Sequence, residues 1–214
     1  RRPDNLVYDW NAIDAFRPAR KVCFDDETLR DGLQSPSVTS PSIGKQIEIL
    51  HLMNNLGIDT ANIGLPGAGP HVLKNVITLA REIHENKLKI KANCAARTVV
   101  QDIDPIIEAV QKTGQPITAA TFIGSSPIRQ YAEGWTVSDL LKHSETAVKH
   151  AVKNGLEVMY VTEDTTRANP EDIRKLYTAA IECGATRLVI CDTVGHATPH
   201  GAKNLIRYVR GIAD

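Results

Sequence analysis

The sequence is 214 residues long, and its 25 basic and 25 acidic side chains give a formal net charge of zero at pH 7. A neutral chain offers no electrostatic reason to expect a nucleic acid or a membrane surface as partner. It contains no apolar run long enough to span a bilayer. The first residues lack the apolar segment of a signal peptide, and the four cysteines form no Cys-x-x-Cys motif. We therefore expect a globular protein of the cytoplasm, a reducing compartment.

A repeating pattern of apolar strand, polar loop and amphipathic helix follows a lead segment, residues 1–20. We expect the lead to be irregular or partly helical, with Trp10 and Phe16 packed on the body. Cys23 and Cys191 fall in predicted strands, Cys94 directly follows one, and all three are expected to be buried. The predicted strands are 21–25, 59–63, 88–93, 117–122, 156–161 and 186–191, and the predicted helices lie near 42–56, 71–86, 101–113, 136–154, 170–183 and 199–211.

The residues at the predicted helix ends support these assignments. Thr136 with Asp139 resembles a capping box, and Asn169 before Pro170 is an N-cap followed by proline at the first helical position. Glycines follow four of the predicted helices, where a left-handed C-cap favours glycine. These four glycines are Gly57, Gly114, Gly155 and Gly184.

Six strand–loop–helix units predict an α/β fold with a parallel sheet. A nucleotide-binding doubly wound sheet is less favoured, because no Gly-x-Gly-x-x-Gly follows the first strand and no Walker A motif occurs. Polar residues at the strand ends favour a TIM (β/α)8 barrel, of which the chain supplies about six βα units. Residues 21–214 would form this barrel catalytic domain, incomplete at its C-terminus; an open α/β sheet is the alternative. Two exposed sheet edges predict that the isolated chain aggregates or oligomerises.

Polar side chains follow every predicted strand, and in a barrel all of these positions meet at one mouth. Two arginines, several carboxylates and several hydroxyls suit a small anionic substrate held together with a divalent metal ion. The residues are Arg30, Asp31, Asn62, Asn93, Arg97, Thr121, Ser125, Ser126, Thr162, Glu163, Asp164, Asp192 and Thr193.

Each of the charged groups also has a purely structural interpretation. Arg30 and Asp31 would form a strand-end salt bridge, and Arg97 would pair with a neighbouring carboxylate. Asp192 would cap the turn that follows it, and the Glu163–Asp164 pair would be solvated. No zinc pair is expected from His196 and His200, because Pro199 interrupts a shared helix.

The unbroken run DETLRDGLQ, residues 26–34, resembles the signature of the metal-dependent aldolase-like TIM-barrel family, the DRE-TIM metallolyases. That family includes 2-isopropylmalate synthase, homocitrate synthase, citramalate synthase and 3-hydroxy-3-methylglutaryl-CoA (HMG-CoA) lyase. The resemblance covers about residues 20–214 and leans toward the 2-isopropylmalate synthase branch. It continues in the segments 63–66, 95–97, 122–128, 162–164 and 192–199.

The resemblance implies a metal-dependent Claisen condensation of acetyl-CoA with a 2-keto acid, followed by thioester hydrolysis, as in leucine biosynthesis. It implies a divalent ion (Mg²⁺, Mn²⁺ or Zn²⁺) with Asp31 as a ligand, and a homodimeric full-length protein. Arg30 and Glu163 would be catalytic. The residues that bind substrate would be Arg30, Gln34, Arg97, Glu163 and Thr193.

Three positions depart from the family pattern. The His-x-His metal pair expected on a seventh strand does not occur in this sequence, Asn62 stands where strand two usually carries glutamate, and Arg129 stands where a histidine is frequent. Two alternatives therefore remain open. One is a homocitrate synthase-like, citramalate synthase-like or HMG-CoA lyase-like enzyme, and the other is a catalytically inert barrel fragment.

Overall fold

The computed structural model describes residues 20–214 of the chain. The expectations for the lead segment, including Trp10 and Phe16, lie outside the described residues, apart from Arg20.

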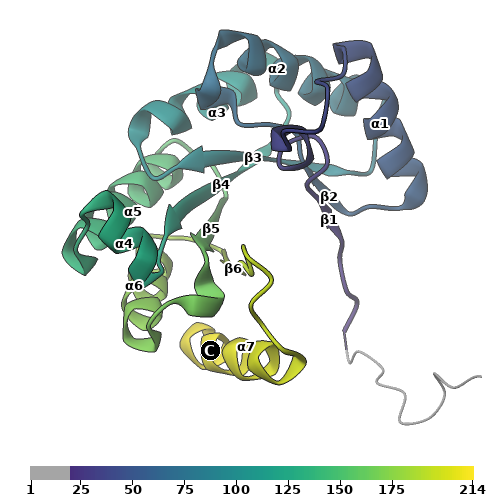
Figure 1. Ribbon diagram of the computed structural model, residues 1–214. Coiled ribbons are helices and arrows are strands. Elements are labelled where there is room, and N and C mark those ends of the chain that lie inside the picture. The colour runs from purple at the N-terminus through teal and green to yellow at the C-terminus, as the bar shows by residue number, and fades with distance from the viewer. Residues whose placement is uncertain (1–19) are drawn as a thin grey trace, which may run out of the picture.

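Six parallel strands form one sheet in which every strand pairs with its neighbour in the sequence. A doubly wound sheet reverses its strand order, whereas this order runs in one direction from first to last. Figure 1 shows the sheet curling into an open arc with the helices on its outer side. The predicted α/β fold is confirmed, as a curled half-barrel. The strands are β1 (Asp25–Asp26), β2 (Thr60–Asn62), β3 (Lys91–Arg97), β4 (Ile117–Gly124), β5 (Val158–Glu163) and β6 (Arg187–Ile190).

A helix follows each strand, as the sequence predicts, and one additional short helix, α4 (Pro127–Glu133), lies between β4 and the long helix that follows it. The capping box at Thr136 and Asp139 is present, and the Asn169 side chain accepts the Glu171 N–H. The other helices are α1 (Ile43–Leu56), α2 (Pro70–Glu85), α3 (Val100–Thr113), α5 (Val137–Lys153), α6 (Pro170–Glu182) and α7 (Pro199–Ala213), with short 3₁₀ turns η2 (Gly32–Gln34), η3 (Pro66–Ala68) and η4 (Thr165–Arg167).

The hydrophobic core lies between the outer face of the sheet and the helices. The helices α1, α2, α3, α5 and α6 each bury several apolar side chains, as expected for three- and four-residue spacing. Burying each of these side chains contributes about 1.5–3 kcal/mol. Fully buried examples are Leu50, Val76, Leu79, Ile103, Ile106, Leu140, Val148, Ile173 and Leu176.

The predicted burial of the first strand is wrong. Val22 and Phe24 are 56% and 63% exposed, Cys23 is exposed, and the strand itself is only Asp25–Asp26. The reason is position: β1 is an edge of the sheet among the described residues, and it pairs only with β2. The apolar residues 22–24 do not by themselves reveal whether another strand or helix covers them.

Three central strands run further toward the mouth than predicted, and one of them is β4, which ends at Gly124 rather than at residue 122. β3 ends at Arg97 rather than Asn93, and β5 ends at Glu163 rather than Val161. Glu163 therefore belongs to the hydrogen-bonded strand, where it pairs with Gly124 of β4. A side chain held in a sheet is more rigid than one on a loop, which suits a functional residue.

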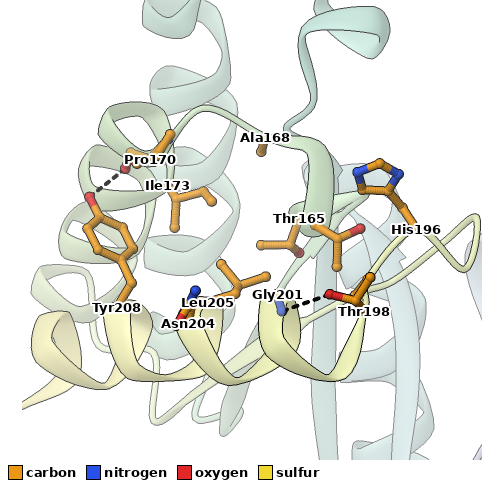
Figure 2. A pocket seen from close by; sticks show the side chains of 12 residues that line it. Thr165, Ala168, Pro170, Ile173, His196, Thr198, Gly201, Asn204, Leu205 and Tyr208 are labelled. Carbon is orange, nitrogen blue, oxygen red and sulfur yellow. Dashed lines mark hydrogen bonds between the residues drawn. The ribbon is translucent and has the colours of Figure 1, made fainter.

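The last helix packs against the start of α6 and leaves a cavity of about 620 Å³ between them. Figure 2 shows the Tyr208 hydroxyl donating to the Pro170 carbonyl at 2.7 Å, and the Thr198 hydroxyl accepting the Gly201 N–H at 3.1 Å. None of the predicted site residues lines this cavity. Among residues 20–214, no helix is long and apolar enough to cross a membrane.

Candidate active site

The carboxyl ends of all six strands open onto one cavity of about 790 Å³, on the inner side of the curled sheet. Four of the five residues predicted to bind substrate line it, together with the predicted metal ligand. These are Arg30, Gln34, Glu163 and Thr193, with Asp31. The convergence follows from the topology, because parallel strands place their carboxyl ends at one edge of the sheet.

The loop after β1 is anchored to the core by Leu29. Leu29 is 3% exposed, while the Glu27 carbonyl accepts the backbone N–H groups of Arg30 and Gly32 at 3.1 Å. The Asp26 carboxylate accepts the Thr28 N–H at 2.8 Å. The backbone turn and the Leu29 anchor therefore hold the neighbouring polar side chains at the mouth.

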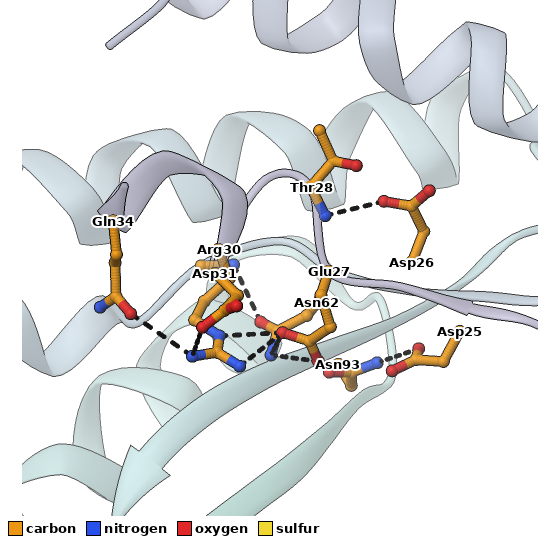
Figure 3. A network of polar contacts seen from close by, with 10 residues as sticks. Asp25, Asp26, Glu27, Thr28, Arg30, Asp31, Gln34, Asn62 and Asn93 are labelled. Carbon is orange, nitrogen blue, oxygen red and sulfur yellow. Dashed lines mark hydrogen bonds and ion pairs between the residues drawn. The ribbon is translucent and has the colours of Figure 1, made fainter. Parts of the chain in front are cut away.

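Arg30 is surrounded by acceptors from its own loop, as Figure 3 shows. Its Nε and Nη2 donate to Glu27 Oε2 at 2.9 and 2.6 Å. Its Nη1 donates to Asp31 Oδ1 at 3.1 Å and to Gln34 Oε1 at 3.5 Å. The predicted salt bridge between Arg30 and Asp31 is present, and the guanidinium lies in the cavity wall.

Sequence reasoning assigned no role to Glu27, although it lies inside the recognised motif. Its two carboxylate oxygens lie 3.2 Å from the Asn62 amide nitrogen. A carboxylate therefore lies beside Asn62, although position 62 itself carries an amide. The sequence did contain a signal for Glu27, because alternate side chains of a strand point to the same face and Glu27 therefore shares a face with Asp25. Both residues line the cavity, whereas Asp26 does not.

Burial raises the pKa of the Glu27 carboxyl above its ordinary value, and the nearby Arg30 guanidinium counters this only in part. Deeper in the curl, the Asp25 carboxylate accepts hydrogen bonds from the Thr60 hydroxyl and from the Asn93 amide, the latter at 2.8 Å. The Asn93 side chain of β3 thus stabilises the position of Asp25 in β1.

The opposite wall is built by two loops bonded to each other, the one after β5 and the one after β6. The Asp164 N–H donates to the Thr193 hydroxyl at 2.9 Å, and the Thr166 hydroxyl donates to the Asp192 carboxylate at 2.8 Å. The Cys191 N–H donates to the Thr165 hydroxyl at 2.9 Å. Three successive residues of one loop therefore hold three successive residues of the other.

Asp164 has a left-handed backbone, with φ at 57°, and is nearly buried. Its carboxylate accepts Nε and Nη2 of Arg167 at 2.8 and 2.6 Å, which holds the Asp164 pKa below its usual range. Asp164 is therefore a fixed structural group rather than half of a solvated pair. Beside it, the Glu163 carbonyl accepts the backbone N–H and the hydroxyl of Ser125 at 3.2 and 3.1 Å.

Asp192 caps its own turn, which was one of its two interpretations. Its carboxylate accepts the His196 and Ala197 N–H groups at 2.8 and 3.1 Å, and its hydrogen bond from Thr166 chiefly lowers its pKa. Cys191 lines the cavity, and burial raises the pKa of its thiol to about 11. A thiol with that pKa is protonated at neutral pH and is a poor nucleophile.

Comparison with known proteins gives this architecture a family. Residues 21–212 match the sequence profile of the HMGL-like family. The chain belongs to the HMGL-like family. Similar curated proteins include the 2-isopropylmalate synthases of Pyrococcus abyssi, 35% identical over 192 residues, and of Lactococcus lactis subsp. cremoris, 34% identical over 181 residues.

These alignments cover 89% and 84% of this HMGL-like chain but only 38% and 34% of the two synthases. The chain therefore spans little more than a third of the length of these relatives. The crystal structure of HMG-CoA lyase from Bacillus subtilis superimposes with a TM-score of 0.72 at 18% identity, covering 89% of this chain and 64% of that one. At this identity the likeness shows the barrel fold alone.

Arg97 differs from the other predicted site residues of this HMGL-like chain in its position. It does not line the cavity, and its Nε and Nη2 donate to the Asp102 carboxylate at 2.7 and 2.8 Å. Asp102 is buried in the first turn of α3. The geometry supports the structural interpretation of Arg97, and its role in substrate binding stays a prediction.

Arg129, which stands where the family often has histidine, lies in the first turn of the extra helix α4. It lines a side pocket of about 300 Å³ that shares Glu163 and Thr193 with the main cavity. Its Nη2 lies 3.3 Å from Glu133 Oε1, and its side chain is about half exposed. The departure therefore places a cation beside two of the predicted substrate residues.

The residues described here do not by themselves fit a resident metal ion. Within residues 20–214, no three His, Cys, Asp or Glu side chains lie close enough together to hold one. Asp31 is 67% exposed and pairs with Arg30. Divalent ions in proteins require several oxygen or nitrogen ligands. Asp31 stays a candidate ligand.

Proposed function

We propose that the protein to which these residues belong is an acyltransferase that condenses acetyl-CoA with a 2-keto acid, as a 2-isopropylmalate synthase does in leucine biosynthesis. One observation carries this proposal: Arg30, Glu163 and Thr193 face one cavity at the carboxyl ends of the strands. The printed names of the similar curated proteins support the same reaction class.

The condensation needs three events at this cavity. A base removes a proton from the acetyl methyl group, and the resulting enolate carbon attacks the ketone carbon of the keto acid. A carbon–carbon bond forms, and the ketone oxygen takes the electron pair and then a proton. Water then cleaves the thioester, releasing CoA and a dicarboxylic acid. Negative charge thus develops first on the thioester oxygen and then on the former ketone oxygen.

Arg30 is suited to stabilise that developing charge. A guanidinium has five N–H donors in a fixed plane, and the contacts with Glu27, Asp31 and Gln34 leave an N–H on Nη2 for a substrate oxygen. A donor held in advance of the reaction stabilises an oxyanion without reorganisation. The 3.5 Å contact with Gln34 is long and would be readily exchanged for a substrate contact.

Thr193 and Glu163 would orient the keto acid on the opposite wall. The Thr193 hydroxyl oxygen accepts the Asp164 N–H, so its own O–H remains free to donate to a substrate carboxylate. Glu163 presents its side chain from the end of β5, where Ser125 donates to the Glu163 backbone carbonyl. A carboxylate there would accept a hydrogen bond from the hydroxyl group that the condensation forms.

The remaining parts of this proposal concern the whole protein. We infer a divalent ion (Mg²⁺, Mn²⁺ or Zn²⁺) with Asp31 as one ligand and further ligands from outside the described residues. Such an ion would polarise the ketone. We also infer a homodimer and a cytoplasmic location.

Two other candidates each rest on one observation. Arg129, beside Glu163 and Thr193, favours a keto acid that carries a second carboxylate, as in homocitrate synthase. The lack of a three-ligand cluster within residues 20–214 favours an inert barrel fragment. Citramalate synthase and HMG-CoA lyase activities are tested by the same assay with other substrates.

The deciding experiment measures release of free CoA from acetyl-CoA by the full-length gene product, with added metal and with 2-ketoisovalerate, pyruvate and 2-ketoglutarate in parallel. Cleavage of HMG-CoA is assayed beside it. We expect turnover with one keto acid, lost on addition of a chelator and in an Asp31→Ala variant. Absence of turnover with every substrate would contradict the proposal and favour the inert fragment.

A further inference from the structure

Glu27, in the wall of the main cavity, contacts both Arg30 of its own loop and Asn62 of β2. One of its oxygens, Oε2, receives Nε and Nη2 of Arg30 at 2.9 and 2.6 Å. Both of its oxygens lie 3.2 Å from the Asn62 amide nitrogen. The Glu27 carboxylate therefore bridges the loop after β1 and strand β2.

Asn62 is oriented to serve this carboxylate. Its side chain is buried, with a residue exposure of 1%, and its amide oxygen accepts the Gly64 N–H at 3.3 Å. Because the oxygen is committed to that N–H, the amide nitrogen must face Glu27. The backbone of β2 thus fixes the direction of the donor that holds the carboxylate.

The contact with Glu27 determines which edge of the Arg30 guanidinium is free. Nε and one N–H of Nη2 form one edge of the planar group, and both point at Oε2 of Glu27. On the edge formed by Nη1 and Nη2, Nη1 donates to Asp31 at 3.1 Å and, at a long 3.5 Å, to Gln34. The second N–H of Nη2 remains available to a substrate. A guanidinium held along one edge presents the other edge in a fixed plane.

The arrangement is electrostatically unfavourable for the carboxylate itself. Burial raises the Glu27 pKa, and the attraction of Arg30 offsets this only in part. Charged groups kept at some cost in a cleft are typical of functional sites.

We propose that Glu27, held by Asn62, is a positioning residue that fixes the plane of the Arg30 guanidinium against the reacting substrate oxygen. This inference rests on the proposed function of the cavity. Glu27 acts through Arg30, so its loss disturbs the chemical step more than the binding of either substrate.

The test compares variants of the full-length protein in the CoA-release assay. Glu27→Gln keeps the shape and removes the charge, and Glu85→Gln, on the exposed end of α2, is the matched control. We expect Glu27→Gln to lower kcat by about 100-fold, the order of effect that misplacement of a catalytic group by about 1 Å produces. KM for both substrates should change by less than about threefold if positioning alone is lost.

A relocation variant separates positioning from general damage. In Glu27→Gln/Asn62→Glu the carboxylate moves across the 3.2 Å contact from the loop to strand β2. We expect the kcat of this double variant to be at least about tenfold higher than that of Glu27→Gln, because Arg30 again has a charged acceptor within reach. No recovery, or a Glu27→Gln kcat within about threefold of wild type, would overturn the inference.

A readout without turnover keeps this inference distinct from the proposed function. In protein labelled with ¹⁵N-arginine, the Arg30 Nε–H resonance is assigned by its absence from Arg30→Lys. We expect this proton to exchange slowly in wild type, fast in Glu27→Gln and slowly again in the relocation variant. If no keto acid supports turnover, the proposed function fails; if the Nε–H exchange is unchanged in Glu27→Gln, the positioning role fails. Glu27→Asp replaces Glu27→Gln in both measurements if the latter does not fold.

Discussion

The two walls of the cavity are held by different kinds of contact. The wall after β1 is organised mainly within its own loop: Arg30 contacts residues three positions before it and one to four positions after it, and one further contact joins Glu27 to Asn62 of β2. The wall formed by the loops after β5 and β6 is organised by hydrogen bonds between residues 26 to 29 positions apart. A local network produces a contiguous sequence motif, whereas a network between loops exists only once the strands are neighbours.

The largest expected effect comes from breaking the local network at its centre. Arg30→Lys keeps the charge but loses the planar fork, so kcat/KM in the CoA-release assay should fall by about 10²- to 10³-fold. The matched control is Arg81→Lys, on the exposed side of α2, which should retain wild-type activity. Activity of Arg30→Lys close to wild type would show that the fork is not required.

The second prediction breaks the contacts between the loops. Thr165 is buried, and its hydroxyl donates to the Thr162 carbonyl and accepts the Cys191 N–H. Thr165→Val leaves that N–H without an acceptor, so the free energy of unfolding, measured with urea, should fall by about 1–3 kcal/mol. Thr146→Val, on an exposed helix face, is the control. An unchanged urea midpoint would show that this contact does not hold the wall.

The third prediction uses pH to examine the same wall. Arg167 lowers the Asp164 pKa in the folded state, so the ionised carboxylate stabilises the fold above the ordinary aspartate pKa of about 3.9. This contribution is lost as pH falls through the lowered folded pKa. Asp164→Asn tolerates the left-handed backbone and removes only the charge.

Wild type should therefore be more stable than Asp164→Asn at pH 7, and the difference should shrink below about pH 4. Thermal unfolding of both proteins across this range measures it. A difference that stays constant with pH would show that the Arg167 contact does not depend on the charge of Asp164.

The fourth prediction concerns the side pocket shared by Glu163 and Thr193. Arg129→His removes a permanent cation from the edge of the cavity. KM for the keto acid should change by about tenfold, the order of one charged contact, while KM for acetyl-CoA stays within about twofold. A larger change in KM for acetyl-CoA than for the keto acid would indicate that Arg129 contacts acetyl-CoA instead.

The smallest effect on activity is expected at Arg97, which lies outside the cavity. Arg97→Gln should leave kcat/KM within about threefold, because Arg97 does not line the cavity, and should lower the free energy of unfolding by about 1–3 kcal/mol, because the buried Asp102 carboxylate loses two charged donors. Steady-state kinetics and urea unfolding test both parts. A drop in keto-acid affinity would instead support the substrate-binding role that the resemblance implies.

The contrast between the two walls explains what the sequence could and could not reveal. Amphipathic periods predicted the order of strands and helices, and the caps at Thr136 and Asn169 marked helix starts correctly. The Arg30 loop was recognisable because its interacting residues are contiguous. The hydrogen bonds from Thr165 and Thr166 to the loop after β6 were not visible, because each joins residues 26 positions apart.

Other misses have equally specific causes. The helix α4 has only seven residues, too few to show a helical period. The exposure of Val22 and Phe24 depends on which neighbours cover the first strand, and their hydrophobicity does not report that. Glu27 could have been found by noting that it shares a strand face with Asp25.

The one-directional strand order also sets a gradient of protection along the sheet. β3, β4 and β5 are hydrogen-bonded on both sides, whereas β1 has a partner on one side only among the described strands and contributes two residues. Local opening is easiest where backbone hydrogen bonds are few and exposed. Amide hydrogen exchange should therefore be slowest in the middle strands and fastest around the Arg30 loop. An anion that binds Arg30 would reveal itself by slowing exchange in that loop, while the middle strands would remain unchanged.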